Sequence, residues 1–146
     1  MSHARVPRFN ALIRRGIDDR DLYRRALRRV REPGLQALLQ ENLHTLDALI
    51  DDLQVQVRAN GQAPARHGTL AGAVRSALAE LTVGMSHDRD VAWIHCLARN
   101  ECVLLHCFEQ QMAHASAESA RVLGIQLTRL HGIHNDMHCL AGTTHG

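Results

Sequence analysis

The sequence predicts an all-α protein, an antiparallel four-helix bundle formed by a single domain of residues 1–146. Three observations lead to this prediction. Aromatic residues make up only 3% of the chain, and Leu, Ala and Arg, which favour helices, are abundant. Apolar residues recur at helical spacing in four long segments. A chain of this length can also bury a sizeable core without disulfide or metal staples.

The first predicted helix covers about residues 9–31, and the second about residues 35–60. At roughly 100° per residue, the apolar side chains of each segment fall on one side. Glu32-Pro33-Gly34 separates the two helices with residues that favour a turn, and Asn60-Gly61 ends the second with residues that accept left-handed backbone angles. We therefore expect an antiparallel helical hairpin. Its apolar stripes are Phe9, Leu12, Ile13, Gly16, Tyr23, Leu27 and Val30, then Leu35, Leu38, Leu39, Leu43, Leu46, Leu49, Ile50 and Leu53.

A second hairpin follows a long connection. The stretch QAPARHGT, residues 62–69, is rich in helix breakers and precedes a short helical segment at about 70–83. Ser86 or Asp88 can cap a long helix at about 88–114, and a last helix covers about 117–140. A single long crossover that carries a short extra helix is the type of connection found in ferritin-like bundles.

Charge is distributed unevenly along the chain. All seventeen basic residues are Arg, and ten of them lie in residues 1–31, which carry a net charge of +7 against −5 for the rest. Arg clusters suit phosphates and anionic surfaces. The second helix contains Glu41, Asp47, Asp51 and Asp52, which can neutralise much of this positive charge. Nucleic-acid binding is therefore not the favoured interpretation.

The cysteines and the apolar runs favour a cytoplasmic protein without a membrane segment. Cys96, Cys102, Cys107 and Cys139 form no Cys-x-x-Cys pair, and the chain begins with no apolar stretch of signal-peptide length. No apolar run is long enough for a spanning helix. In projection Cys96 and Cys107 point inward and Cys102 points away. Cys107 with a histidine of the last helix remains a possible soft-metal site, because thiolate and imidazole suit zinc.

Several polar residues project into the predicted core at similar depth, and such groups must be hydrogen-bonded when buried. We expect a network closed on itself, for example Arg20 with Asp19 or Glu101. The alternative is a metal site that uses Glu101 and His134 with His131 or His138, since His134 and His138 are four residues apart and share a helix face. The inward polar residues are Asp19, Arg20, Asn42, Asn100, Glu101 and His134.

An ordered set of residues resembles one bacterial family over about residues 9–138. The set comprises Phe9-Asn-Ala-Leu-Ile13, Asp18, Tyr23, Ala26, Leu35-Gln-Ala-Leu-Leu39, Asp52-Leu53, Thr69-Leu-Ala-Gly72, Asn100-Glu101, Phe108 and His134-Asn-Asp136. It resembles the bacterial ferritin-like family known only as a domain of unknown function and sometimes grouped with rubrerythrin-type domains. The resemblance implies a left-handed four-helix bundle of unassigned activity, with Asp18, Tyr23, Glu101 and His134 as candidate site residues.

The sequence also departs from that family. Arg20 stands where the family often has Glu, and Ala98 and its neighbours replace the acidic pair before Glu101. The resemblance therefore implies a degenerate di-metal site, and we do not expect iron oxidation of the ferritin type.

The leading hypothesis is a non-catalytic bundle protein, associated with stress or with partner binding, that forms a dimer or binds another protein. The first alternative is an iron- or zinc-binding, redox-type bundle that uses Glu101 and His134. Its possible neighbouring ligands are Asp18, Asp19, Tyr23, His131 and His138. The second alternative is the binding of an anionic partner by the Arg-rich first helix.

Overall fold

The computed structural model describes residues 6–143, which form five helices and no strand. This agrees with the all-α prediction, and each of the five expected helical segments is found. The helices are α1 (Val6–Leu27), α2 (Pro33–Ala59), α3 (Leu70–Gly84), α4 (Arg89–Ala113) and α5 (Ala117–Thr143).

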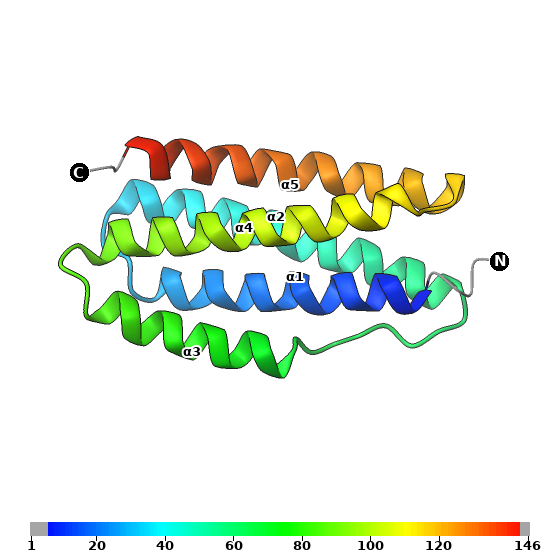
Figure 1. Cartoon of the computed structure of the whole chain (residues 1–146), viewed down its shortest axis with the longest axis horizontal. Helices are drawn as coiled ribbons and strands as arrows, with labels where there is room; N and C mark the ends of the chain where they lie inside the picture. The colour runs from blue at the N-terminus through cyan, green and yellow to red at the C-terminus, as the bar shows by residue number, and fades with distance from the viewer. Residues whose placement is uncertain (1–5, 144–146) are drawn as a thin grey trace.

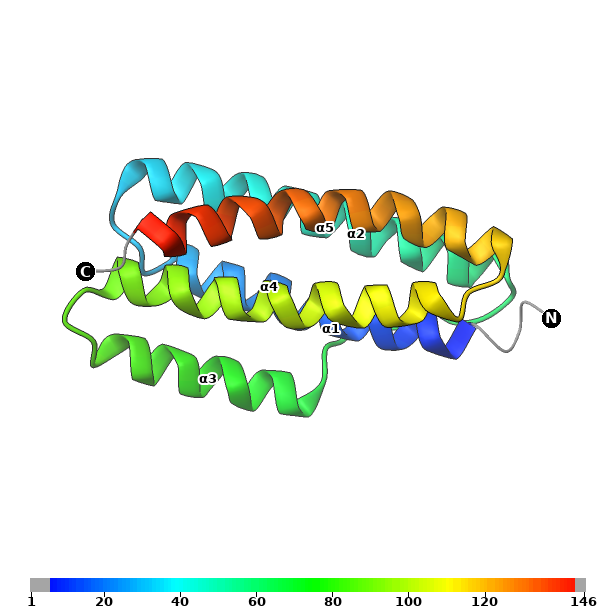
Figure 2. The ribbon, with the colours of Figure 1, turned by 45° about the horizontal axis from the view of Figure 1, so that its top comes forward.

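Four long helices lie side by side, and the short helix α3 lies outside them (Figures 1 and 2). The pairs α1–α2 and α4–α5 are hairpins, while α1 also packs on α4 and α2 on α5. The connection between α2 and α3 runs back along the molecule, and α3 then packs against α1 and α4 (Figure 1). None of the described helices combines the length and apolar character needed to cross a membrane.

Side-chain caps begin α2, α3, α4 and α5, and at α5 the Ser116 hydroxyl accepts from the Ser119 amide at 3.2 Å. The Glu32 carboxylate accepts from the amides of Gly34 and Leu35 at 3.0 and 2.6 Å, and Asp88 accepts from the Val91 amide at 3.2 Å. Thr69 caps α3 by accepting from the Gly72 amide at 2.8 Å. Each cap satisfies amide groups that the first helical turn leaves without a partner. Asp88 is one of the two caps that the sequence predicts for α4.

Apolar residues from α1, α2, α4 and α5 fill the space between the long helices. Leu39, Leu46, Leu49 and Leu97 are completely buried, as is the ring of Phe108. Burial of each such side chain contributes about 1.5–3 kcal/mol, so this core is the main source of stability. α1 ends at Leu27, four residues before the predicted end, although the following Val30 still packs into the core.

Asp18 ties α3 to α1. Its two carboxylate oxygens accept from the Thr69 amide at 2.8 Å and from the Thr69 hydroxyl at 2.7 Å. A Cβ atom added to Gly68 or Gly72 would overlap the Asp18 carboxyl group. The connection can therefore approach α1 this closely only because glycine occupies both positions.

The outward face of α3 is strongly apolar. The exposed fractions of Val74, Leu78 and Leu81 are 53%, 57% and 66%, and those of Leu70 and Met85, at the two ends, are 83% and 87%. These five residues follow each other at steps of four, four, three and four, so they form one continuous helical stripe.

Candidate functional site

The structure places the two principal candidate residues, Glu101 and His134, in different environments. The Glu101 side chain lies in the core and is 1% exposed. The His134 ring is half-buried in the groove between α4 and α5, where its neighbours are Cys102 and His138. Glu101 and Cys102 are consecutive in α4 but lie on its buried and exposed sides, so the predicted residues separate into two groups.

The first group is a buried polar cluster from three helices. Asp19 and Tyr23 come from α1, Asn42 from α2 and Glu101 from α4, and none of them is more than 4% exposed. Among the described residues, both carboxylates, the Tyr23 hydroxyl and the Asn42 amide nitrogen have no partner in hydrogen-bonding geometry. The four groups nevertheless lie close enough to influence each other's pKa. Buried polar groups without well-formed hydrogen bonds are costly, so this cluster lowers the stability of the core.

Burial raises the pKa of both acids. The pKa of Asp19 rises from 3.8 to about 6, mainly through desolvation, with a smaller contribution from the neighbouring Asp18 charge. The pKa of Glu101 rises well above its usual value through desolvation and through repulsion from Asp19. Desolvation and the two carboxylates also raise the pKa of Tyr23. Glu101 therefore retains a proton more readily than Asp19, and the pair titrates as a unit.

This cluster does not fit the two-metal site of ferritin-like bundles. Such sites use four carboxylates and two imidazoles, because two metal ions need several anionic oxygens. Here the cluster supplies Asp19 and Glu101 only, and no histidine is among its four groups. Arg20 does not neutralise them, since its guanidinium group reaches Asp47 at 3.5 Å and Asp21 at 3.8 Å. The expected network of Arg20 with Asp19 or Glu101 is thus replaced by surface ion pairs.

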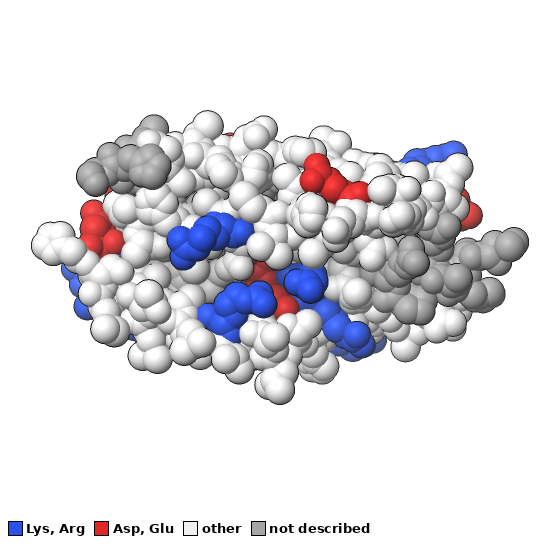
Figure 3. All heavy atoms as spheres, in the orientation of Figure 1, with Lys and Arg blue, Asp and Glu red and all other residues white. Residues whose placement is uncertain are grey.

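A small cavity of about 30 Å³ lies beside Asp19, between α1, α3 and α4, and has room for one or two water molecules. Its lining includes Asn100, a predicted member of the polar layer, together with Asp18, Arg15 and Arg75. Figure 3 shows acidic surface at the middle of one face of the molecule with basic side chains around it. Asp18 itself is engaged by Thr69, so its role here is to hold α3.

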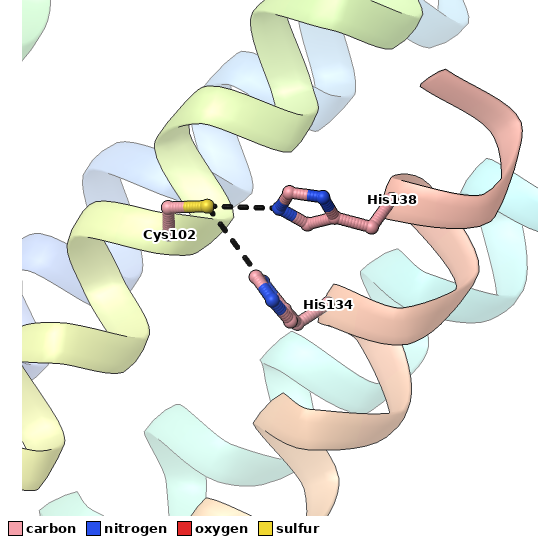
Figure 4. A group of neighbouring side chains, drawn as sticks. All are labelled: Cys102, His134 and His138. Atoms are coloured by element: carbon pink, nitrogen blue, oxygen red, sulfur yellow. Dashed lines mark hydrogen bonds between the residues drawn. The ribbon is translucent and has the colours of Figure 1, made fainter. Parts of the chain in front are cut away.

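The second group consists of Cys102 from α4 with His134 and His138 from α5. The Cys102 sulfur lies 3.0 Å from His138 Nε2 and 3.9 Å from His134 Nδ1. The two imidazole rings are 4.1 Å apart between centroids. Figure 4 shows the sulfur pointing from α4 toward α5, with both rings facing it. The three ligand atoms all lie within 4.8 Å of one another.

These distances are close to those of a tetrahedral metal site. With zinc–sulfur and zinc–nitrogen bonds of about 2.3 and 2.0–2.1 Å at tetrahedral angles, a sulfur and a nitrogen ligand lie about 3.6 Å apart. The two observed sulfur–nitrogen distances, 3.0 and 3.9 Å, fall on either side of this value. Side-chain movements that shift these atoms by a few tenths of an ångström would bring Cys102, His134 and His138 to the distances of one bound ion.

The electrostatics of the groove favour an uncharged imidazole. Desolvation is the largest factor that lowers the pKa of His134, and the positive forms of His138 and His131 lower it further. A neutral imidazole has a lone pair free for a metal ion. His131 is exposed and acts on His134 only through its charge, so it does not belong to the group of three.

The sequence alone did not identify Cys102 as a member of this group. The sulfur that meets the α5 histidines is that of Cys102, whereas the soft-metal site considered above used Cys107. The signal in the sequence was the His134–His138 spacing together with an outward cysteine on the facing helix. Pairing them requires the register of α4 against α5, which helical periodicity does not contain.

Comparisons with known proteins give one result. The family model described as Domain of unknown function (DUF2383) matches residues 5–114. The matched part contains Asp19, Glu101 and Cys102, whereas His134 and His138 lie beyond it. Neither the curated proteins nor the solved structures gave a match.

Proposed function

The chain belongs to the family described as Domain of unknown function (DUF2383), which assigns no activity, and from this premise we propose that the protein is a metal-binding helical bundle. In this proposal Cys102, His134 and His138 hold one zinc ion in the groove between α4 and α5. The observation that carries it is the convergence of three ligand atoms from two helices within 4.8 Å.

Zinc is the ion that fits this ligand set best. One thiolate and two imidazoles form a mixed sulfur–nitrogen set, which suits zinc and copper, while iron sites in helical bundles rely on carboxylates. The cytoplasmic location expected from the sequence supports the proposal, because a reducing compartment would keep Cys102 available as a thiolate.

Metal binding without catalysis is the form of the proposal with the most support. Three ligands leave one tetrahedral position open, but the acids able to move protons, Asp19 and Glu101, belong to the buried cluster. The arrangement of two hairpins joined by one long crossover also supports the ferritin-like fold that the sequence predicts, with a di-metal site that has lost its function.

An ion shared by Glu101 and His134 has less support. The Glu101 carboxylate is enclosed with Asp19 and Tyr23, while the His134 ring lies 3.9 Å from the Cys102 sulfur. We expect a Glu101→Gln variant to keep its zinc, because the buried cluster contributes no ligand to the proposed ion.

The test is the zinc content and affinity of the untagged full-length protein. After removal of all metal, titration calorimetry should give about one zinc per chain, and Cys102→Ala or His138→Ala should weaken binding at least tenfold. Cys139→Ala and His131→Ala are matched controls, because both residues are exposed on α5 outside the group of three. Equal loss of affinity in Cys102→Ala and Cys139→Ala, or no zinc binding by the intact chain, would overturn the proposal.

A further inference from the structure

A hollow of about 720 Å³ is lined by the end of α1, the second half of α3 and the start of α4. These helix ends lie at the left of Figure 1. Its volume is within the range of about 300–1,000 Å³ that small-molecule sites occupy. It does not include any member of the buried cluster or of the Cys102 group.

Arginines form the rim of this hollow. Arg25, Arg28, Arg29, Arg31 and Arg89 contribute five positive charges from three segments of the chain. Guanidinium groups bind phosphate and carboxylate through paired hydrogen bonds, so several of them around one space favour an anion.

Glu80 is the only acidic residue among those that line the hollow. Its carboxylate accepts from Arg25 at 2.5 Å and from Arg29 at 3.0 Å. Hydrogen bonding from Arg29 is the main factor that lowers the pKa of Glu80, and Arg25 adds to it, so Glu80 is ionised at neutral pH. One carboxylate thus offsets one of five positive charges and holds two of the guanidinium groups in place.

The floor of the hollow is apolar. The side chains of Val30, Val83 and Trp93 are buried beneath it, while Leu81 borders it and is 66% exposed. An inorganic anion would contact the rim but would leave the exposed Leu81 side chain in water, which is unfavourable. The hollow therefore matches a molecule with an anionic head and an apolar body.

We propose that this hollow binds a small amphipathic anion, with a phosphate or carboxylate head among the arginines and an alkyl or aromatic body against Trp93 and Leu81. The site is independent of the proposed zinc ion. It also gives the Arg-rich first segment a role different from nucleic-acid binding, since four of its arginines, Arg25, Arg28, Arg29 and Arg31, line a space of small-molecule size.

The single tryptophan of the chain provides the reporter for a test. Trp93 is 1% exposed and lies beneath the hollow, so its fluorescence should change when a charged ligand fills the space above it. The probes are decyl phosphate, decanoate, decyltrimethylammonium and inorganic phosphate, added as monomers to the full-length protein. We expect saturable binding of the two amphipathic anions that weakens with added salt, at least tenfold weaker binding of inorganic phosphate, and no binding of the cation.

Variants of the rim test the role of the charges. Arg28→Ala with Arg89→Ala should weaken decyl phosphate binding about tenfold or more, because charged hydrogen bonds are lost. Glu80→Gln should strengthen it severalfold, since Arg25 and Arg29 lose their carboxylate partner. Arg121→Ala on α5 is the matched control and should not change the affinity; the circular dichroism of all variants should match that of the wild type.

Three results would overturn this proposal. Equal binding of decyltrimethylammonium and decyl phosphate would mean that only apolar contact matters. Unchanged affinity in the double arginine variant would remove the rim from recognition. Binding to anionic phosphatidylglycerol vesicles without binding of monomeric decyl phosphate would assign the arginines to a membrane surface instead.

Discussion

Asp19 and Glu101 are two acids in a space that excludes water, and this makes them a proton-holding pair. Desolvation raises both pKa values; the Asp19 charge raises the pKa of Glu101 further, whereas the contact with Glu101 lowers that of Asp19. The raised pKa of Tyr23 keeps its hydroxyl group protonated, so it remains a possible donor to an ionised partner. The cluster thus has the composition of a proton-sharing group, in which Glu101 holds the proton and Asp19, with a pKa of about 6, is mostly ionised at neutral pH.

This pair should make folding stability depend on pH near 6. A carboxyl whose pKa is higher in the folded chain binds more protons there, so stability should rise as pH falls from above 6 toward 3.8. We predict that Asp19→Asn is about 1–3 kcal/mol more stable than the wild type at pH 8, with the difference shrinking toward pH 5. Urea unfolding at the two pH values measures it.

An exposed carboxyl of α2 supplies the comparison. Asp51→Asn should leave the free energy of unfolding within about 0.5 kcal/mol of the wild type at both pH values. If Asp19→Asn were less stable than the wild type by the same amount at pH 8 and pH 5, the raised pKa of Asp19 would not be the source of the effect.

Helical projection placed six polar residues in the core. Asp19, Asn42 and Glu101 are buried there, whereas Asn100, His134 and Arg20 are only half-buried. The same projection placed Arg20 there, but a side chain of this length can leave an inward position and reach solvent, where it finds Asp47. Periodicity gives the direction of a Cα–Cβ bond and not the position of a distant guanidinium group.

Among the elements, α3 is held to α1 by the contact of Asp18 with Thr69 and the adjacent glycines, and to the end of α1 by the bonds of Glu80 with Arg25 and Arg29. We predict that Gly72→Ala destabilises the protein by about 1–3 kcal/mol, because the added methyl group displaces the Asp18 carboxylate from Thr69. The midpoint of thermal unfolding should fall accordingly.

A second glycine in a helix is the matched control. Gly132 lies within α5, and an added Cβ there would meet nothing within 4 Å. Gly132→Ala should therefore stabilise the protein by up to about 1 kcal/mol, the usual gain in helix propensity. Equal changes in Gly72→Ala and Gly132→Ala would show that the Asp18 contact does not hold α3.

Helix boundaries were predictable where a breaker or a cap marks them and less so elsewhere. Pro33, Asn60 and Asp88 each stand at an observed helix end. The end of α1 at Leu27 has no such signal, and the segment that follows it is held from outside, since the Asp90 carboxylate accepts from the backbone amides of Arg31 and Glu32 at 3.0 Å. That contact comes from α4, so local sequence could not reveal it.

At the scale of the whole molecule, the arrangement of hairpins was more predictable than the meeting of their side chains. Chain reversals and one long crossover follow from the positions of breakers along the sequence. The position of Cys102 opposite His134 and His138 depends on how far α4 is shifted along α5. That shift results from packing of the entire core, and one sequence does not record it.

We expect a dimer from the sequence, and the exposed apolar stripe of α3 is a surface through which two copies could associate. We propose that a second copy covers the part of the stripe that does not border the hollow, Leu70, Val74 and Leu78, because it carries no charge and an identical surface is its natural complement. Leu78→Glu should shift sedimentation from dimer to monomer at micromolar concentration. Ile125→Glu, a similarly exposed site on α5, should not; a monomeric wild type would contradict the proposal.

The position of Cys102 on one helix and its two histidines on the next means that a bound ion would act as a reversible cross-link. Cys102 and His134 are 32 residues apart in the sequence, so one ion would close a loop containing most of the α4–α5 hairpin. Closing such a loop restricts the unfolded chain in the way that a disulfide does. The supply of metal would then set how firmly the last helix is attached, and the chain would respond to zinc through its stability.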